Sequence, residues 1–369
     1  MRVKQVKTFQ LGAALLCLAM TAAPVFAAAP SPEALAKKAG VAWPAVIAHR
    51  GASYDAPEST RPAYIAARDL GADYLEMDLQ RTRDGQLVAF HDDTLLRTTD
   101  VATRFPDRRD KPISAFTLAE LRELDAGSWF NTAYPDRARP AFQGAKVLTL
   151  DEIIDIADAD PENRTGLYIE TKVPSLYPGI EADLKAKLIS RGWLTPSGEV
   201  AAGHHVVLQT FEKASLELLA KEMPKVPKVL LLWVGEGSIE PESKVAFADS
   251  GIKDKAAYYA SQRPASKEAF ASWVDFAKAQ GAVGTGPSTA LTKGGDQSYM
   301  DLVQPWMNKL THAKGLLVHV YTVDDPVDFD KVKKAGVDGI FTNRAAELLK
   351  FDGRPSKRSV QAILDDEGY

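Results

Sequence analysis

The chain has 369 residues, with 45 basic and 49 acidic side chains and a formal net charge of −4. Hydrophobic residues make up 45% and charged residues 25%, which excludes a disordered chain, a collagen-like repeat and a multi-span membrane protein. The small acidic excess argues against nucleic-acid binding, for which a basic excess is usual.

The first 27 residues have the pattern of a secretory signal. Three basic residues precede a short apolar stretch at 11–20, and an alanine-rich segment follows at 25–29. We predict a signal peptide over 1–27, cleaved after Ala27; an uncleaved membrane anchor is the alternative, although the stretch is short for a span. Cleavage would remove three positive charges and the single cysteine, Cys17, and leave 42 basic against 49 acidic residues. A periplasmic or secreted protein without stable membrane insertion is therefore expected.

From residue 44 to 351, short apolar runs alternate with amphipathic helical patterns. This alternation is typical of a parallel sheet covered by helices, and eight runs predict a closed (β/α)₈ TIM barrel, an α/β fold. The expected strands are 46–48, 74–78, 167–170, 206–208, 229–232, 282–283, 317–320 and 339–341. The expected helices include 61–70, 150–159, 180–190, 214–221, 267–280 and 327–335.

Three stretches depart from the alternation. Residues 74–91 predict a β-hairpin, because the turn signal at 82–85 leaves no room for a crossover helix, and a centred turn would place Asp78 opposite His91. Residues 92–148 contain no clear strand and are interpreted as an insertion over the barrel mouth, where substrate selectivity could reside. Residues 352–369 are interpreted as a frayed polar C-terminal tail.

Polar side chains gather where the predicted strands end, which is where barrel enzymes place catalytic groups. Residues two apart on a strand share a face, so Glu76 lies with Asp78, and Glu170 with Lys172. Each pair alone could be a polar strand face or an ion pair, and a lone histidine could be buried and hydrogen-bonded. The groups at consecutive ends are His49, Arg50, Glu76, Asp78, His91, Asp92, Glu170 and Lys172.

Together these residues predict metal-assisted phosphoryl chemistry. Three converging carboxylates repel one another unless a hard cation lies between them, and all-oxygen ligands favour Ca²⁺ or Mg²⁺ over zinc. His49 and His91 could donate and accept protons near neutral pH, and Arg50 and Lys172 could bind an anion such as a phosphodiester. The other histidines fit less well: the pair 204–205 precedes a strand, position 319 lies inside one, and position 312 suits a helix surface.

The sequence resembles the glycerophosphodiester phosphodiesterase family over residues 46–349. The segment TTDVATRFPDR at 98–108 is similar to the secreted, periplasmic branch of that family. The matching motifs are HRGAS at 49–53, PEST at 57–60, ADYLEMDL at 72–79, TRDG at 82–85, LVAFHD at 87–92, LTLDE at 148–152, YIETK at 168–172, QTF at 209–211, VYTV at 320–323 and GVDGIFTN at 336–343.

The resemblance implies a barrel enzyme that hydrolyses glycerophosphodiesters to sn-glycerol 3-phosphate and an alcohol. It implies one divalent metal, with Ca²⁺ preferred and Mg²⁺ as the alternative, and a small-molecule diester as substrate, with no nucleic-acid partner. The implied roles are metal binding by Glu76, Asp78 and Glu170, acid–base catalysis by His49 and His91, phosphate binding by Arg50 and Lys172, and supporting positions at Glu58, Gln209 and Tyr321.

The chain departs from the family pattern at four positions. Ser59 and Asn343 stand where the family often has Asn and Asp, and Tyr321 and Asp324 where many members have Trp and Asn. Two other functions remain open from the sequence: a phosphodiesterase acting on another glycerol- or inositol-phosphate diester or a glycerophosphate polymer, and an inactive barrel that only binds phosphorylated ligands.

Overall fold

The computed structural model describes Met1 and residues 30–159, 165–290 and 300–369. The predicted signal peptide, apart from Met1, lies outside the described residues. Among the helices of the described part, none combines the length and apolar character needed to cross a membrane.

Eight parallel strands form a closed barrel, as predicted. Neighbouring strands pair in parallel around the ring, and β1 pairs with both β2 and β9, which closes it. The barrel strands are β1 (Ala45–Ala48), β2 (Tyr74–Arg81), β4 (Gly166–Thr171), β5 (Val206–Thr210), β6 (Lys228–Leu232), β7 (Gly284–Pro287), β8 (Leu317–Val320) and β9 (Gly339–Thr342).

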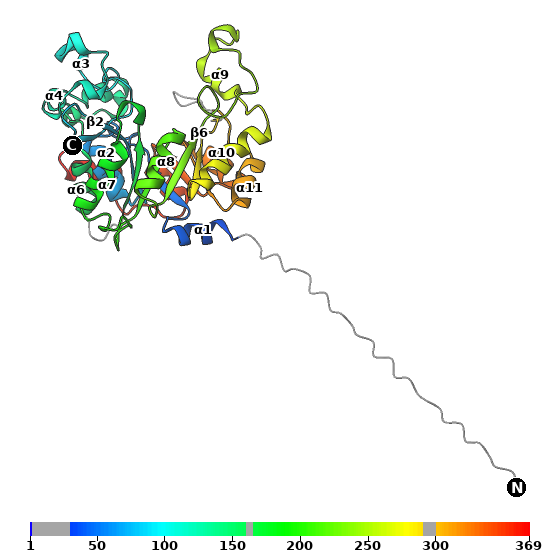
Figure 1. Ribbon diagram of the computed structural model, residues 1–369. Coiled ribbons are helices and arrows are strands. Elements are labelled where there is room, and N and C mark those ends of the chain that lie inside the picture. Colours follow the sequence, from blue (N-terminus) through cyan, green and yellow to red (C-terminus); the bar gives the residue numbers. More distant parts are fainter. Residues whose placement is uncertain (2–29, 160–164, 291–299) are drawn as a thin grey trace.

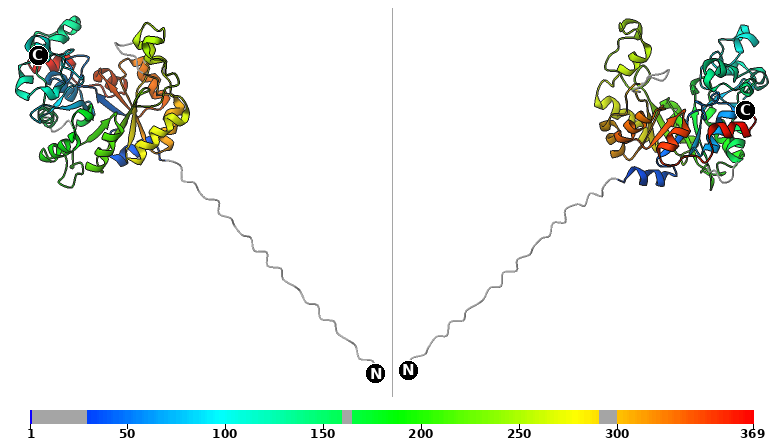
Figure 2. Two further views of the ribbon diagram at one scale, coloured as in Figure 1. Left: turned by 45° about the horizontal axis from the view of Figure 1, so that its top comes forward. Right: turned by 180° about the vertical axis from the view of Figure 1, so that it is seen from behind.

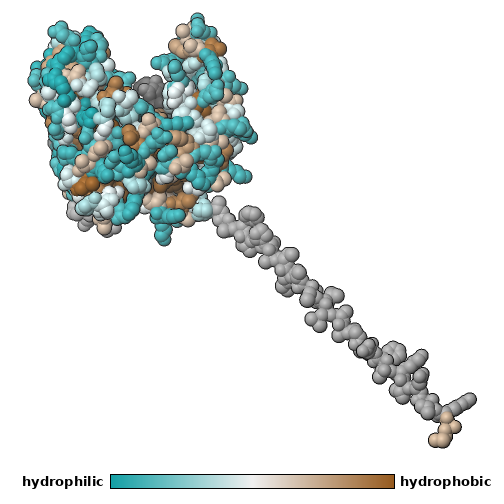
Figure 3. Space-filling view, viewed as in Figure 1, coloured by the Kyte–Doolittle hydropathy of each residue, from teal (hydrophilic) through white to brown (hydrophobic). Residues whose placement is uncertain are grey.

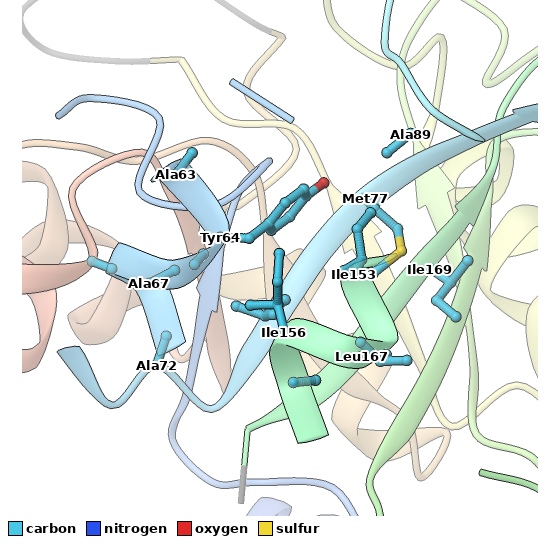
Figure 4. Close-up of a cluster of buried hydrophobic side chains, with 14 of the residues drawn as sticks. Ala63, Tyr64, Ala67, Ala72, Met77, Ala89, Ile153, Ile156, Leu167 and Ile169 are labelled. Atoms are coloured by element: carbon cyan, nitrogen blue, oxygen red, sulfur yellow. The ribbon is translucent and has the colours of Figure 1, made fainter. Parts of the chain in front are cut away.

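Helices surround the barrel and pack on its outer face (Figures 1 and 2). Capping boxes begin α6 at Thr149 with Glu152, and α4 at Thr117 with Glu120. Figure 4 shows the packing where α2 and α6 lie against β2 and β4 through alanine, isoleucine and Tyr64 side chains. The surrounding helices are α2 (Arg61–Leu70), α6 (Leu150–Asp158), α7 (Ile180–Ser190), α8 (Lys213–Glu222), α10 (Lys267–Ala279), α11 (Pro305–Ala313), α12 (Pro326–Ala335) and α13 (Ala345–Phe351).

The inside of the barrel changes character along its axis. Toward the amino ends of the strands the inward side chains are apolar or aromatic, and α1 (Pro32–Ala39) covers this end (Figure 1). His319 lies within this part, in β8 as expected, and is fully buried with Nδ1 2.9 Å from the Tyr168 hydroxyl. The apolar floor leaves the opposite end of the barrel for polar chemistry.

Two projections rise at the carboxyl end of the strands, with a notch between them (Figures 1 and 3). One is the insertion at 92–148, with α3 (Val101–Arg104), α4 (Leu118–Glu123) and α5 (Ser128–Ala133). It stands beside the mouth rather than over it, which corrects the prediction. The other, residues 233–266 with α9 (Lys255–Ser261), was not predicted, because this stretch carries neither a repeat nor a marked helical periodicity.

Two further predictions were wrong in detail. In the hairpin of β2 with β3 (Leu87–Ala89), Leu79 pairs with Ala89, so the register is shifted by one residue and Asp78 lies opposite Phe90 instead of His91. The C-terminal segment is not a frayed tail, because it forms α14 (Val360–Asp366), whose buried Ile363 and Leu364 belong to the main core.

Candidate active site

The barrel strands deliver polar side chains to one cavity through simple alternation. In β2 and β4, an inward apolar residue near the floor is followed two positions later by a polar one near the rim, since side chains alternate across a strand. Thus Tyr74 is followed by Glu76 and Asp78, and Tyr168 by Glu170. The resulting cavity has a volume of about 530 Å³. Its rim and walls hold all seven residues predicted for metal, phosphate and proton transfer: His49, Arg50, Glu76, Asp78, His91, Glu170 and Lys172.

Three buried carboxylates meet at the centre of this cavity. Glu76, Asp78 and Glu170 each offer one oxygen, and these oxygens lie within 4.8 Å of one another. β2 and β4 bring them together because Asp78 and Glu170 are paired directly across the strands. Gln209, from β5, donates from Nε2 to Glu76 Oε1 at 3.1 Å.

The electrostatics of this triad fit a bound cation. Burial, reinforced by the charge of Asp78, raises the pKa of Glu76 well above its usual value. Burial likewise raises the pKa of Glu170 to about 7, although Lys172 opposes the shift. Burial also opposes ionisation of Asp78, but the charges of Arg50, His91 and Lys172 together outweigh it and hold the pKa of Asp78 below its usual range. Gln209 Oε1 is buried beside the triad with no hydrogen-bond partner among the described residues, and such an acceptor suits the hydration shell of an ion.

A tight turn after β1 directs Arg50 into the cavity. Arg50 has a φ of 56°, and Gly51, with a φ of 86°, lies where a Cβ would meet Ala63 C at 2.6 Å. The Arg50 N–H donates to Glu76 Oε2 at 2.8 Å, and its Nε lies 3.2 Å from Asp78 Oδ2. Glu58 Oε1 accepts from Arg50 Nη1 at 2.9 Å, so this residue supports the arginine rather than lying among the carboxylates.

Lys172 extends the positive charge to the other side of the triad. Its Nζ lies 3.3 Å from Glu170 Oε1 and 3.7 Å from Asp78 Oδ1. Arg50 and Lys172 therefore flank the acidic centre, where both could reach a phosphate group placed on a bound ion.

The two histidines have different partners on Nδ1. His49 Nδ1 lies 2.8 Å from the Asn343 amide oxygen, whereas His91 Nδ1 lies 2.6 Å from the Asp92 carboxylate. Burial lowers the pKa of His49 to about 3 and also lowers that of His91. His91 follows β3 after the chain has left the strand, so it reaches the cavity despite the shifted register.

Arg97 links the supporting groups of both sides. It donates to both oxygens of Glu58, at 2.9 and 2.7 Å, and to both oxygens of Asp92, at 2.6 and 2.9 Å. Because Glu58 holds Arg50 and Asp92 holds His91, Arg97 fixes both at once. Arg97 lies in the insertion, outside the predicted strands, so no sequence pattern indicated this role.

One wall of the cavity is aromatic and comes largely from residues that sequence reasoning did not select. Tyr321, placed among the supporting residues above, belongs to this wall, and its hydroxyl donates to the Leu232 carbonyl at 3.0 Å. Its ring lies 5.7 Å from that of Phe211, edge to face. Lys255 and Tyr259 enter from α9, and the described cavity lining includes no residue of 92–148. The aromatic rings are Phe211, Trp233, Tyr259, Tyr321 and Phe341.

The remaining histidines lie outside the cavity. His204 and His205 occupy the loop before β5, and the His204 ring packs 4.4 Å from that of Trp193. His312 is on α11, as expected, but its Nε2 lies 2.8 Å from Asp338 Oδ2, so it is not simply a surface residue.

Known proteins resemble this chain in sequence and in fold. The model of the glycerophosphoryl diester phosphodiesterase family matches residues 49–347. A glycerophosphodiester phosphodiesterase of Bacillus subtilis is 34% identical over 297 residues, which cover 80% of this chain and 82% of the relative. A glycerophosphoinositol inositolphosphodiesterase of mouse is 27% identical, covering 83% of this chain and 47% of the relative.

Solved structures show the same barrel. An Oleispira antarctica phosphodiesterase in complex with its product sn-glycerol-3-phosphate has a TM-score of 0.58 and 22% identity, over 84% of this chain and 97% of the other. A glycerophosphodiester phosphodiesterase from Agrobacterium tumefaciens has a TM-score of 0.50 and 22% identity, over 82% of this chain and 96% of the other.

Proposed function

Because the chain belongs to the glycerophosphoryl diester phosphodiesterase family, we propose that it hydrolyses glycerophosphodiesters to sn-glycerol 3-phosphate and an alcohol, using one divalent ion and two histidines. The observation that carries the proposal is the convergence in one cavity of three carboxylates, two imidazoles and two cationic side chains. Each of these groups has a task in diester hydrolysis.

Glu76, Asp78 and Glu170 would hold the ion. A bound divalent ion would supply positive charge to a phosphate oxygen and lower the cost of the negative charge that develops in the transition state. Carboxylate oxygens are the ligands of Ca²⁺ and Mg²⁺, and we propose Ca²⁺ as the preferred ion because the three side chains leave room for additional oxygen ligands.

The residues of the chain perform the remaining steps. Arg50 and Lys172 bind the phosphate from two sides and orient it. One histidine removes a proton from the attacking hydroxyl, and the other donates a proton to the oxygen of the departing alcohol. The attacking group is either water or a glycerol hydroxyl of the substrate, and the latter would give a cyclic phosphate that ³¹P NMR detects.

The decisive experiment measures glycerol 3-phosphate release from glycerophosphodiesters by the metal-free protein and after addition of Ca²⁺ or Mg²⁺. We expect no release without metal, restoration by one or both ions, and loss of activity in Glu76→Ala and His49→Ala with unchanged far-ultraviolet circular dichroism. As a matched control, Glu152→Ala removes a carboxylate from the α6 capping box, remote from the chemistry. Full activity in Glu76→Ala or His49→Ala would overturn the role assignment.

The cavity is large enough for a leaving group beyond glycerol phosphate, so the alcohol remains to be identified. A panel of choline, ethanolamine, inositol and polymeric glycerophosphate substrates would rank the candidates. Tight binding of several diesters without turnover, in the presence of metal, would favour the inactive-barrel alternative.

We further propose that the protein is exported and processed after Ala27. The support is the N-terminal pattern in the sequence and the absence of cysteine from the remainder of the chain. Cell fractionation with mass spectrometry of the mature N-terminus tests this, and a cytoplasmic chain that still carries residues 1–27 would contradict it.

A further inference from the structure

A short hydrogen-bond chain runs from His49 away from the cavity to Asp324. His49 Nδ1 lies 2.8 Å from Asn343 Oδ1, and Asn343 Nδ2 donates to Asp324 Oδ2 at 2.8 Å. The other oxygen of Asp324, Oδ1, accepts from the Asn343 backbone N–H at 2.7 Å. Asp324 therefore accepts hydrogen bonds from both the backbone N–H and the side-chain NH₂ of Asn343.

The chemistry of these groups fixes the direction of every bond. Burial raises the pKa of Asp324, but in its ionised form this carboxylate only accepts, so the Asn343 amide turns its NH₂ toward Asp324 and its oxygen toward His49. The Ser53 hydroxyl, which donates to Asn343 Oδ1 at 2.8 Å, supports the same orientation. An amide oxygen also only accepts, so the hydrogen of neutral His49 must lie on Nδ1. Nε2 then presents its lone pair, and this is the form that a proton acceptor requires.

We infer that Asp324 is a positioning residue, which orients the Asn343 amide and thereby holds His49 in the tautomer with its hydrogen on Nδ1. Asp324 does not touch the reacting atoms, and acts only through Asn343. The effect on turnover rests on the proposed function, whereas the tautomer itself does not.

The opposite order, with an amide at position 324 and a carboxylate at position 343, would satisfy the same bonds. Either order supplies one carboxylate and one amide. In the exchanged order, the carboxylate at position 343 would accept from both His49 Nδ1 and the NH₂ of the amide at position 324. The oxygen of that amide would accept the backbone N–H. The double exchange therefore preserves all bond directions.

The single change Asp324→Asn does not preserve them. If the oxygen of the new amide still accepts from the Asn343 backbone N–H, the NH₂ of that amide faces the Asn343 side-chain NH₂, and two donors meet. Rotation of the Asn343 amide relieves that contact, but it turns the NH₂ toward His49 and forces the imidazole hydrogen to Nε2. The other orientation leaves the Asn343 N–H, a partly buried donor, without its acceptor, which is costly.

The test compares four proteins: the unaltered protein, Asp324→Asn, the double variant Asp324→Asn/Asn343→Asp, and Asp325→Asn. Asp325 is the matched control, since it is the next residue and pairs with Arg344 at 3.1 Å outside the chain of bonds. We expect kcat to fall at least about tenfold in Asp324→Asn with little change in KM, to recover in the double variant, and to stay unchanged in Asp325→Asn.

The second readout is the His49 tautomer, observed in long-range ¹H–¹⁵N NMR spectra and assigned by comparison with His49→Gln. We expect the hydrogen on Nδ1 in the unaltered protein and the double variant, and on Nε2 in Asp324→Asn. A hydrogen on Nε2 in the unaltered protein would overturn the inference, as would a folded double variant that stays as slow as Asp324→Asn. If the unaltered protein hydrolyses no diester, the proposed function fails, and the spectra still decide the inference.

Discussion

At the scale of single residues, the two imidazoles differ in what lies behind them. The Asp92 carboxylate beside His91 favours a positively charged ring, whereas the neutral Asn343 amide beside His49 gives much less support to a charge. Burial lowers the pKa of both rings. His91 is therefore the better candidate for the proton donor, and His49 for the acceptor.

This difference predicts how the variants respond to the leaving group. In His91→Ala, replacing the alcohol by p-nitrophenol should restore most of the lost rate, because p-nitrophenolate departs without a proton. His49→Ala should remain slow with both substrates, since the attacking hydroxyl is still not deprotonated. Steady-state rates on matched alkyl and p-nitrophenyl esters measure this, and equal rescue of both variants would contradict the assignment.

At this scale the sequence predicted the site residues that end strands and missed those that act through loops. His49, Glu76 and Glu170 follow from strand alternation alone. Arg97 and Trp233 could not be selected, because their positions depend on how two long connections fold back on the barrel. Asp324 was noted only as a departure from the family pattern, without a role.

At the scale of elements, the insertion at 92–148 is attached to the active site through Arg97. Its guanidinium joins Glu58 and Asp92, the partners of Arg50 and His91. The insertion thus acts on the chemistry by fixing these side chains, although it adds nothing to the described cavity lining.

Arg97→Met should therefore lower kcat by roughly 10- to 100-fold, the range found when supporting hydrogen bonds around a metal site are removed. The apparent affinity for metal should change little, because the three carboxylates keep their places. Arg104→Met is the matched control, since Arg104 lies in the same insertion and pairs only with Asp100 among the contacts described for it, at 3.3 Å on the surface. Comparable losses in both variants would show a general effect of the insertion instead.

The C-terminal helix α14 is part of the core and packs against α2. Leu364→Ala should reduce the free energy of unfolding by about 2–5 kcal/mol, the usual cost of truncating a buried leucine. Gln361→Ala, on the exposed face of the same helix, should have little effect. Chemical denaturation measures both, and equal stability of the two variants would mean that α14 contributes little to the core.

Specific physical reasons explain why sequence patterns located some elements imprecisely. β7 consists of Gly284-Thr285-Gly286-Pro287, a composition that strand propensity disfavours. A Cβ at Gly284 would meet the backbone oxygen of Leu317 at 2.8 Å, so the close approach of β8 favours glycine there. The hairpin register depends on the conformation of the turn, which the Asp-Gly pair alone does not specify. The apolar residues of α14 are too few to distinguish a docked helix from a tail.

At the scale of the whole molecule, metal binding should be linked to stability and pH. The folded metal-free protein keeps a proton on Glu170 up to about pH 7, whereas the unfolded chain releases it near pH 4.5. The metal-free protein therefore loses stability as the pH rises through this range. A bound ion takes the place of the proton and removes the loss.

Saturating Ca²⁺ should consequently raise the melting temperature more at pH 7.5 than at pH 5, by several degrees at the higher pH. The comparison uses protein freed of metal by dialysis, with Glu170→Gln as the control that should lose most of the shift at both pH values. A shift that is equal at the two pH values, or larger at pH 5, would contradict the linkage.

The barrel was predictable as a whole because its signal is repeated eight times along the chain. The two projections were harder to predict, since the sequence of neither one contains a repeat or a marked periodicity. The sequence placed the first over the mouth and did not indicate the second, and only the folded arrangement shows that the second contributes to the cavity lining.

Lys255 and Tyr259 both come from the projection at 233–266. This arrangement has a consequence for how such enzymes diversify. The groups proposed for bond cleavage lie at the ends of the barrel strands, whereas part of the cavity lining comes from residues 233–266. A chimera that exchanges this stretch with that of a relative should acquire the relative's preference among alcohols while its rate constant for cleavage is retained. New specificities could then arise by replacing one loop, with the reaction itself inherited intact.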